Sequence, residues 1–490
     1  MTLLDEWFDR GLARNPDGVA LRVGRRGLTY RELDAEVNGL AAPLAAQGRR
    51  RVGVLAAKSV TAYAGFLAAL RAGACAVPLA PDSPPERLSA VAAAAHLDAL
   101  ITETPATAVP PALRRLLPPD AIIAADRPAP ATPHRVRGPA RTADDPAYLL
   151  FTSGSTGVPK GVPIRHRNIS AYLSAATARY PDLGPGDVFS QIYDTTFDLS
   201  MSEIFLAWAC GGTLHVLNRL QALAPARLVP HGITVWHATP SLVASLRTAG
   251  RLTPGLLPGI RLTVFCGEPL TAGTVRAWRS AAPNSVVDNL YGPTEASVAC
   301  TGYRWSDDDT TGDDETVPIG DPLPGVHTLI TGGGELCLRG EQVFDGYLVP
   351  EQDRDRFLDH AGHRWYRTGD LVRRGPHGLV HLGRGDSQVK IQGYRVEIAE
   401  VTEALRAAAP GSEVAVLTVG GGTGPQLVAC LMGGPPADQA EVLRRAAARL
   451  PAYMLPRLLW WMPEPVLNPN GKIDRRRLRG IAERRLTAQP

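Results

Sequence analysis

Residues 152–160 read Thr-Ser-Gly-Ser-Thr-Gly-Val-Pro-Lys and directly follow the apolar run 148–151. Hydroxyl side chains, backbone N–H groups freed by glycine and a lysine ammonium are groups that bind phosphate. A Gly-rich turn can also carry a serine nucleophile, but Ser153 stands where the G-x-S-x-G motif needs its first glycine. The Walker A spacing does not fit either. The loop by itself therefore leaves three alternatives: a phosphate site, a hydrolase as the weaker choice, and a polar surface turn.

Lysine is scarce in this chain. Only four of the 52 basic residues are lysines, namely Lys58, Lys160, Lys390 and Lys472. Arginine supplies diffuse positive charge elsewhere, so a retained lysine is a candidate for a task that needs a compact ammonium, such as a phosphate contact. Three of the four lie in glycine-rich or turn-rich segments. For Lys58 we expect no special role.

Composition bounds the class of protein. A chain of 490 residues predicts about three structural units, and a net charge of +4 with scattered basic residues argues against nucleic acid as a partner. The six cysteines form no CxxC pair, which argues against a zinc site or disulfides and favours a reducing compartment. The amino terminus lacks the zones of a signal peptide, and no uncharged apolar run approaches about 20 residues. We expect a cytoplasmic protein that does not bind membranes.

The elements that must position the loop alternate between strands and helices. The segment 51–57 predicts a buried strand and 60–73 a helix, and a second alternating set begins with the strand at 148–151. Such alternation predicts an α/β fold with parallel sheets, whose ligands lie at the carboxyl ends of the strands. From about residue 317 short strands and Gly/Pro turns predict a small β unit. The last 100 residues predict a compact α+β domain with helices near 398–408 and 437–449 and a hairpin over 412–431.

The ordered motifs identify a family resemblance. They are YLLFTSGSTGVPKGV, FDLS, NLYGPTE, GELCLRG, YRTGDL, GRGDSQVKIQGYRVE and NPNGKID. In this order they resemble the adenylate-forming superfamily, and in particular the amino-acid adenylation domains of nonribosomal peptide synthetases. The resemblance covers essentially the whole chain. It implies an N-terminal region of two α/β subdomains and a small β-barrel over residues 1–385, and a mobile C-terminal domain over 386–490.

The reaction implied by the resemblance uses ATP and Mg²⁺. A carboxylate attacks the α-phosphate to give an acyl adenylate and pyrophosphate, and a thiol then takes the acyl group. By the resemblance Glu295 binds Mg²⁺, Thr294 contacts the α-phosphate, Lys472 is the catalytic lysine, and Asp386 is the hinge of the C-terminal domain. In the second step the segment around Lys390 and Gly393 approaches the thiol. The residues expected to bind ATP are Thr152, Ser153, Gly154, Ser155, Thr156, Gly157, Lys160, Gly267, Glu268, Asn289, Tyr291, Gly292, Asp370, Arg384 and Lys472.

The resemblance also indicates the substrate. Amino-acid-activating members carry an aspartate at the position of Asp198, which pairs with the substrate ammonium, next to Phe197. The expected side-chain pocket consists of Leu199, Ser202, His237, Val264, Cys266, Leu290, Val298 and Ala299. It contains no acid or permanent cation, so we expect a small neutral amino acid such as alanine or serine, with a β-amino acid as the alternative. His237 could bind a hydroxyl or simply close a small pocket.

The acceptor follows from the same resemblance. The chain ends 16 residues after Asp474, so we expect no carrier domain after it and predict transfer to the phosphopantetheine thiol of a separate carrier protein, as in antibiotic biosynthesis. An acyl-CoA ligase is the second alternative, disfavoured by Asp198. A catalytically inactive binding homologue is the third, and the joint presence of Lys160, Glu295, Asp370 and Lys472 argues against it.

Overall fold

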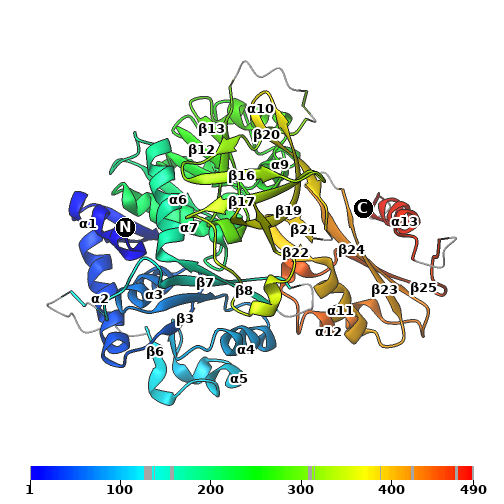
Figure 1. Ribbon diagram of the computed structural model, residues 1–490, viewed down its shortest axis with the longest axis horizontal. Coiled ribbons are helices and arrows are strands. Elements are labelled where there is room, and N and C mark those ends of the chain that lie inside the picture. Colours follow the sequence, from blue (N-terminus) through cyan, green and yellow to red (C-terminus); the bar gives the residue numbers. More distant parts are fainter. Residues whose placement is uncertain are drawn as a thin grey trace.

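Two large sheets carry most of the first 320 residues, and helices pack against both of them (Figure 1). The computed structural model describes residues 2–125, 135–136, 138–154, 159–306, 312–313, 315–386, 388–420, 424–468 and 473–487. Within these ranges no helix is both long and apolar enough to cross a membrane.

The first sheet has six strands in the order β6-β5-β3-β4-β7-β8. They are β3 (Arg51–Leu55), β4 (Cys75–Leu79), β5 (Ala99–Thr102), β6 (Ile122–Ala124), β7 (Pro146–Thr152) and β8 (Lys160–Arg165). All neighbours are parallel except β7 and β8, which form an antiparallel pair. The helices between its strands include α3 (Val60–Arg71), α4 (Pro85–Ala94) and the short α5 (Pro111–Arg114). The strand, helix and strand predicted over 51–57, 60–73 and 148–151 are confirmed.

The second sheet has nine strands in the order β15-β14-β13-β12-β11-β9-β10-β1-β2. They are β1 (Val19–Val23), β2 (Arg26–Thr29), β9 (Val188–Gln191), β10 (Thr213–Val216), β11 (Val235–Ala238), β12 (Leu262–Phe265), β13 (Val286–Tyr291), β14 (Thr301–Arg304) and β15 (Asp321–Pro322). Its central strands β12, β11, β9 and β10 are parallel neighbours. Two strands from the amino terminus complete this edge, because β1 pairs with β10.

Capping chemistry explains where the first long helix begins. In α2 (Tyr30–Ala46) the Thr29 hydroxyl accepts a hydrogen bond from the Glu32 N–H, and the Thr29 N–H donates to the Glu32 carboxylate at 2.8 Å. This reciprocal pair satisfies two backbone donors that a helix end leaves free. Pro43 lies near the other end, and the helix stops at Ala46. α2 packs against α3 and so links the amino terminus to the six-stranded sheet.

The predicted small β unit is a five-stranded antiparallel sheet around one long strand. It consists of β16 (Val326–Ile330), β17 (Glu335–Gly340), β18 (Phe357–His360), β19 (His363–Gly375) and β20 (Gly378–Arg384). β18 pairs with residues 363–366 of β19, β17 with its middle part from Tyr366 to Leu371, and β20 with its last six residues, from Asp370 to Gly375. The unit delivers Asp370 and Arg384 side by side, because these two residues are register partners.

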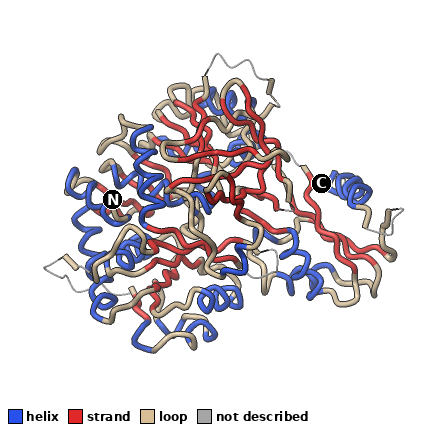
Figure 2. Tube along the Cα trace, viewed as in Figure 1, coloured by secondary structure: helices blue, strands red, loops and turns tan. Residues whose placement is uncertain are grey.

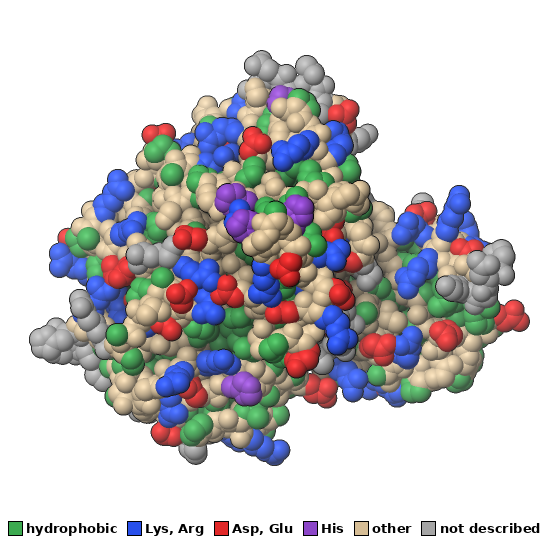
Figure 3. All heavy atoms as spheres, viewed as in Figure 1, with side chains coloured by type: hydrophobic (Ala, Val, Ile, Leu, Met, Phe, Trp, Pro, Cys, Tyr) green, Lys and Arg blue, Asp and Glu red, His purple; other side chains and the backbone are tan. Residues whose placement is uncertain are grey.

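The C-terminal unit, residues 386–487, lies at the right of Figures 1 and 3. Its contacts with the rest of the molecule, here called the core, include those of one hairpin and of the helix that follows it. This hairpin (residues 388–397) is formed by β21 (Gln388–Ile391) and β22 (Tyr394–Glu397). The other elements are α11 (Ile398–Ala408), β23 (Glu413–Val419), β24 (Gln426–Met432), α12 (Gln439–Ala446), β25 (Leu458–Met462) and α13 (Arg475–Thr487). Two buried apolar clusters contain only residues from Ile391 onward, so this unit has its own hydrophobic interior. The predicted helices and hairpin are confirmed. Strands β23, β24 and β25 form a three-stranded sheet, which stands apart from the two large sheets in Figure 2.

Candidate active site

The candidate site lies where the carboxyl ends of the nine-stranded sheet face the end of β7. α7 (Asp198–Ala209) follows β9, Cys266 and Gly267 follow β12, and Gly292 follows β13. Parallel strands leave a crevice at this edge, and the connecting segments line it. The predicted site residues that follow these strands therefore lie at one edge of the sheet.

Asp370 is the centre of one polar cluster. The Tyr291 hydroxyl donates to Asp370 Oδ2 at 2.6 Å, and the Arg384 guanidinium donates to Oδ1 at 2.9 Å. His381 Nε2 lies 3.2 Å from the same Oδ1. Burial alone would raise the pKa of Asp370, but the hydrogen bond with His381 and the charge of Arg384 lower it well below its usual value. The carboxylate is therefore ionised at neutral pH.

A cavity of about 340 Å³ adjoins this cluster. It is large enough for a small organic ligand. Asp386 and Lys390 of the C-terminal unit also line it. The sequence-predicted ATP residues in its wall are Gly267, Glu268, Asn289, Tyr291, Asp370 and Arg384.

Glu295 is fully buried, and its carboxylate is already paired. The Arg395 guanidinium donates to both oxygens at 2.9 Å, and the Tyr347 hydroxyl donates to Oε1 at 2.6 Å. Burial alone would raise the pKa of Glu295, but the charge of Arg395 and the hydrogen bond from Tyr347 lower it. Arg395 belongs to the hairpin, so the C-terminal unit here occupies the carboxylate that was expected to bind Mg²⁺.

The start of the predicted phosphate loop also contacts the hairpin and the helix after it. Ser153 Oγ donates to the Arg395 carbonyl at 2.9 Å and accepts from the Glu397 N–H at 3.0 Å. The Gly154 N–H donates to Glu400 Oε2 at 3.1 Å, and Lys160 Nζ is 3.8 Å from Glu397 Oε1. Thr152, the register partner of Lys160, has a buried hydroxyl without a hydrogen-bond partner among the described residues. Ser155, Thr156, Gly157 and the expected catalytic Lys472 lie outside the described residues.

Asp198 is the first residue of α7 and only 9% of its surface is exposed. Burial raises its pKa to about 6, against the opposing effects of a hydrogen bond from Thr294 and the charge of Lys390. Asp198, Thr294 and Lys390 line one small cavity of about 60 Å³ together with Gly292 and Arg384. A buried carboxylate beside an opening is poised to bind a cation, because removal of water from the carboxylate is then offset by the opposite charge.

Behind Asp198 lies an enclosed pocket with a volume of about 10 Å³, which is room for about one water molecule. The predicted lining is found here except for Ala299: the wall contains Leu199, Ser202, His237, Val264, Cys266, Leu290 and Val298. Tyr172 and Tyr193 complete it, and the Tyr172 and Ser202 hydroxyls are 2.7 Å apart. Both ring nitrogens of His237 lack a partner among the described residues, and burial lowers the pKa of its imidazole to about 3. The pocket is therefore neutral as well as small.

A strained turn supplies part of this wall. Ser297 and Val298 have φ angles of +55° and +80°, a region that a β-branched residue rarely adopts. Gln342 holds the turn through two hydrogen bonds. Its side-chain amide donates to the Ala296 carbonyl at 2.9 Å, and its backbone carbonyl accepts from the Ser297 hydroxyl at 2.8 Å. The turn also packs directly on Gly292, where an added Cβ would lie 2.6 Å from the Ala299 Cα. Strain of this kind costs about 1–3 kcal/mol per residue and is typical of functional sites.

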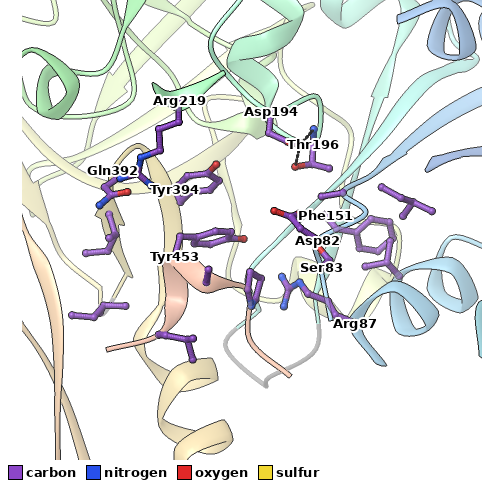
Figure 4. A pocket seen from close by; sticks show the side chains of 18 of the residues that line it. Asp82, Ser83, Arg87, Phe151, Asp194, Thr196, Arg219, Gln392, Tyr394 and Tyr453 are labelled. Atoms are coloured by element: carbon purple, nitrogen blue, oxygen red, sulfur yellow. Dashed lines mark hydrogen bonds between the residues drawn. The ribbon is translucent and has the colours of Figure 1, made fainter. Parts of the chain in front are cut away.

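A cleft of about 530 Å³ separates the core from the C-terminal unit (Figure 4). Tyr394 and Tyr453 stack with ring centroids 4.0 Å apart, and Phe197 meets Tyr394 edge-on at 4.4 Å. Figure 4 shows Arg219 extending toward Gln392 and Tyr394. A second cavity of about 180 Å³ shares Arg219, Gln392 and Tyr394 with this cleft and reaches Phe197 and Thr239. The residue next to Asp198 is thus in contact with the hairpin.

Sequence reasoning missed several residues of the site. Arg395, Tyr347 and His381 contact the predicted carboxylates, and Tyr172 and Tyr193 line the pocket. The one available signal was for Arg395, which follows Lys390 and Gly393 in the motif GRGDSQVKIQGYRVE. Tyr347 and His381 belong to the small β unit, and their contacts depend on how it packs on the larger sheets.

Comparison with known proteins agrees with this geometry. The family described as AMP-binding enzyme matches residues 8–348. The L-proline–[L-prolyl-carrier protein] ligase of Pseudomonas fluorescens is 33% identical, over 97% of this chain and 98% of that protein. Six other curated relatives are much longer, and this chain spans only 6–44% of their length.

Solved structures give the same result. The crystal structure of IdnL7 is 39% identical with a TM-score of 0.71, over 98% of both chains. The adenylation domain AlmE of Vibrio cholerae, in complex with glycyl-adenosine-5'-phosphate, is 26% identical with a TM-score of 0.87, over 100% of this chain and 98% of that one. The site described above and these similarities lead to one conclusion: the chain belongs to the family of AMP-binding enzymes.

Proposed function

We propose that the protein joins the carboxylate of a small neutral amino acid to AMP and then transfers the aminoacyl group to the phosphopantetheine thiol of a separate carrier protein. The observation that carries the proposal is Asp198, a buried carboxylate between a neutral pocket and the cavity that Thr294 lines. In the first step a substrate carboxylate oxygen attacks the α-phosphorus, the bond to the β-phosphate oxygen breaks, and pyrophosphate leaves. In the second step the thiol replaces AMP on the acyl carbon.

The residues around the larger cavity suit ATP. Tyr291 offers an aromatic face for adenine, and the ionised Asp370 can accept hydrogen bonds from both ribose hydroxyls, held in place by Arg384. The hydroxyls and N–H groups of residues 152–157 and the ammonium of Lys160 would bind the β- and γ-phosphates. Lys472 would stabilise the negative charge that grows between the substrate carboxylate and the α-phosphate.

Glu295 would bind Mg²⁺, which neutralises phosphate charge when bound. A single carboxylate combined with phosphate oxygens is a common magnesium site. Within the described residues no group of three or more His, Cys, Asp or Glu side chains could hold a metal by itself. Arg395 must withdraw from Glu295 to make the carboxylate available.

The neutral, nearly filled pocket supports a small neutral side chain. A larger side chain would need Leu199, Val264 or Leu290 to move, and overpacking a buried wall typically costs about 1–3 kcal/mol. The glycyl adenylate bound by AlmE supports the same size class. A β-amino acid is the alternative within this proposal, because a small displacement of the wall would change the distance between the carboxylate and Asp198.

The hairpin supports the second step. Lys390 and Gly393 lie at the small cavity, and the Gly393 N–H donates to Glu268 Oε1 at 2.6 Å. The 180 Å³ cavity between this hairpin and Thr239 would admit the phosphopantetheine arm. Asp386, between β20 and β21, accepts from Arg384 at 2.7 and 2.8 Å, and we assign to it the hinge of the motion that exchanges Lys390 for Lys472.

ATP–pyrophosphate exchange with a panel of amino acids tests the proposal. We expect exchange with glycine, alanine or serine, weaker exchange with bulky side chains, and none with acetate or benzoate. The panel includes β-alanine and other β-isomers to decide the alternative. Exchange with carboxylic acids that lack an amino group, combined with coenzyme A as the better acceptor, would instead establish an acyl-CoA ligase and overturn the proposal.

A further inference from the structure

Lys58 links the two large sheets at the edge that carries the site. It lies three residues after the end of β3, in the six-stranded sheet. Its ammonium donates to the carbonyls of Ile192 and Leu217, the latter at 3.1 Å. These two residues directly follow β9 and β10, two neighbouring strands of the nine-stranded sheet. One lysine thus reaches across from the first sheet to the carboxyl ends of two strands of the second.

Glu203 holds the same segment from the other side. Its carboxylate has no solvent exposure and accepts from the Ile192 N–H at 2.8 Å and the Tyr193 N–H at 3.2 Å. It also accepts from the Gln191 amide at 2.9 Å, and the Tyr63 hydroxyl donates to the Gln191 carbonyl oxygen at 2.6 Å. Among the described residues, the hydrogen bonds of this carboxylate are therefore all with residues 191–193.

Lys58 and Glu203 both contact Ile192, the first residue of the segment 192–198, which we call the substrate segment. The Ile192 N–H donates to Glu203 and the Ile192 carbonyl accepts from Lys58, so both backbone polar groups of this residue are held in place. The next residues form a tight turn in which Asp194 accepts from the Thr196 N–H at 2.9 Å (Figure 4). The turn leads to Phe197 and Asp198. Glu203 is on the same helix as Asp198, so the segment is fixed at both ends.

The residue type fits this task better than arginine would. An ammonium is compact and carries three donors that can point to acceptors from different strands, whereas a guanidinium is a planar fork. The chain uses lysine at only four positions out of 52 basic residues. Contrary to our expectation from the sequence, Lys58 has a specific structural environment. Burial lowers the pKa of Lys58 and raises that of Glu203, so each charged form depends on the opposite charge nearby.

We propose that Lys58 and Glu203 are positioning residues for the amino-acid site: they fix the substrate segment so that Phe197 and Asp198 face the substrate. Neither residue lines the pocket behind Asp198 or the small cavity at its mouth. The inference rests on the proposed amino-acid activation. It adds an element outside the specificity pocket that controls affinity for the amino acid.

Steady-state pyrophosphate exchange with the full chain tests this role. We compare Lys58→Met, Glu203→Gln and the double variant, and measure KM separately for ATP and for the best amino acid. Because these charged hydrogen bonds are buried, we expect the KM for the amino acid to rise by about tenfold or more, with the KM for ATP changed by less than about twofold. A single variant leaves one buried charge without its opposite and could fail to fold for that reason. The double variant removes both charges together and so avoids this problem.

Arg51→Met is the matched control. Arg51 is the first residue of β3, at the end opposite to Lys58, and its guanidinium also donates to a carbonyl, that of Ala95, at 2.8 Å. We expect this variant to keep both KM values. An unchanged amino-acid KM in the double variant, an equal rise of both KM values, or loss of folding of the double variant would each overturn the proposed role. Failure of the wild-type protein to exchange with any amino acid would instead refute the proposed function.

Discussion

The pocket behind Asp198 and the hairpin of residues 388–397 meet at the same site but are built from different interactions. The pocket wall is mainly apolar and closed, and its shape is fixed by packing within the core. The hairpin touches the core mostly through hydrogen bonds and ion pairs, at Ser153, Glu268 and Glu295. In the proposed reaction these are groups that ATP or Mg²⁺ also requires. A rigid apolar wall suits selection of a substrate, whereas exchangeable polar contacts suit an element that must leave and return.

Of the changes that test this comparison, we expect the largest effect at Asp198. We expect Asp198→Asn to lower the rate of amino-acid-dependent exchange by about 10²–10³-fold, because the substrate ammonium would be buried without its counter-charge. Exchange kinetics at saturating ATP measure the effect. The control is Asp17→Asn, which removes an exposed carboxylate paired with Arg31 and should retain full activity. Normal exchange by Asp198→Asn would show that the ammonium is bound elsewhere.

Arg395→Met tests the polar side of the comparison. Arg395 pairs with Glu295 only when the hairpin is docked on the core, so loss of the guanidinium destabilises the docked arrangement alone. The fraction of molecules with a docked hairpin should therefore fall. We expect transfer to the carrier protein to fall by about 10–100-fold while pyrophosphate exchange changes by less than about threefold. Single-turnover loading of a carrier protein gives the first quantity. Arg406→Met, at an exposed pair with Glu403 on α11, is the control, and an equal loss of both activities would contradict the assignment.

Gly393 sharpens the comparison at the tip of the hairpin. Its φ is +84°, and an added Cβ would lie 2.7 Å from the Thr239 Cγ2. We expect Gly393→Ala to slow transfer by about tenfold, because both the backbone angle and the contact disfavour the docked hairpin. Adding Thr239→Ser removes the clashing methyl group and should restore part of the rate. Absence of any recovery would assign the whole effect to the backbone angle.

The pH dependence of binding should separate Asp198 from Asp370. Burial raises the pKa of Asp198 to about 6, so this carboxylate becomes neutral as the pH falls through 6 and then no longer attracts an ammonium. Between pH 7.5 and 5.5 we expect the KM for the amino acid to rise by about fourfold. The pKa of Asp370 is lowered instead, so the KM for ATP should not follow this profile. A flat amino-acid profile would contradict the ionised role of Asp198.

The parts of the site that could be predicted from sequence are those carried by local motifs. The strand, hydroxyl-rich loop and glycines at 148–157 are contiguous, and the expected pocket residues except Ala299 line one cavity. The missed residues depend on contacts between distant segments. Arg395 and Glu295 are 100 positions apart, and the pairing of β1 with β10 joins segments almost 200 residues apart. Alternating apolar residues predict a strand but do not determine which distant strand lies beside it.

The strained turn at Ser297 and Val298 has a consequence for how such a pocket can diverge. Most substitutions that enlarge a buried cavity lower stability, because they remove apolar contacts. At Val298, with φ at +80°, replacement by glycine would also release backbone strain of about 1–3 kcal/mol. The loss and the gain oppose each other at this one position of the wall. Laboratory evolution toward bulkier amino acids should therefore find Val298→Gly before comparable changes at Val264 or Leu290.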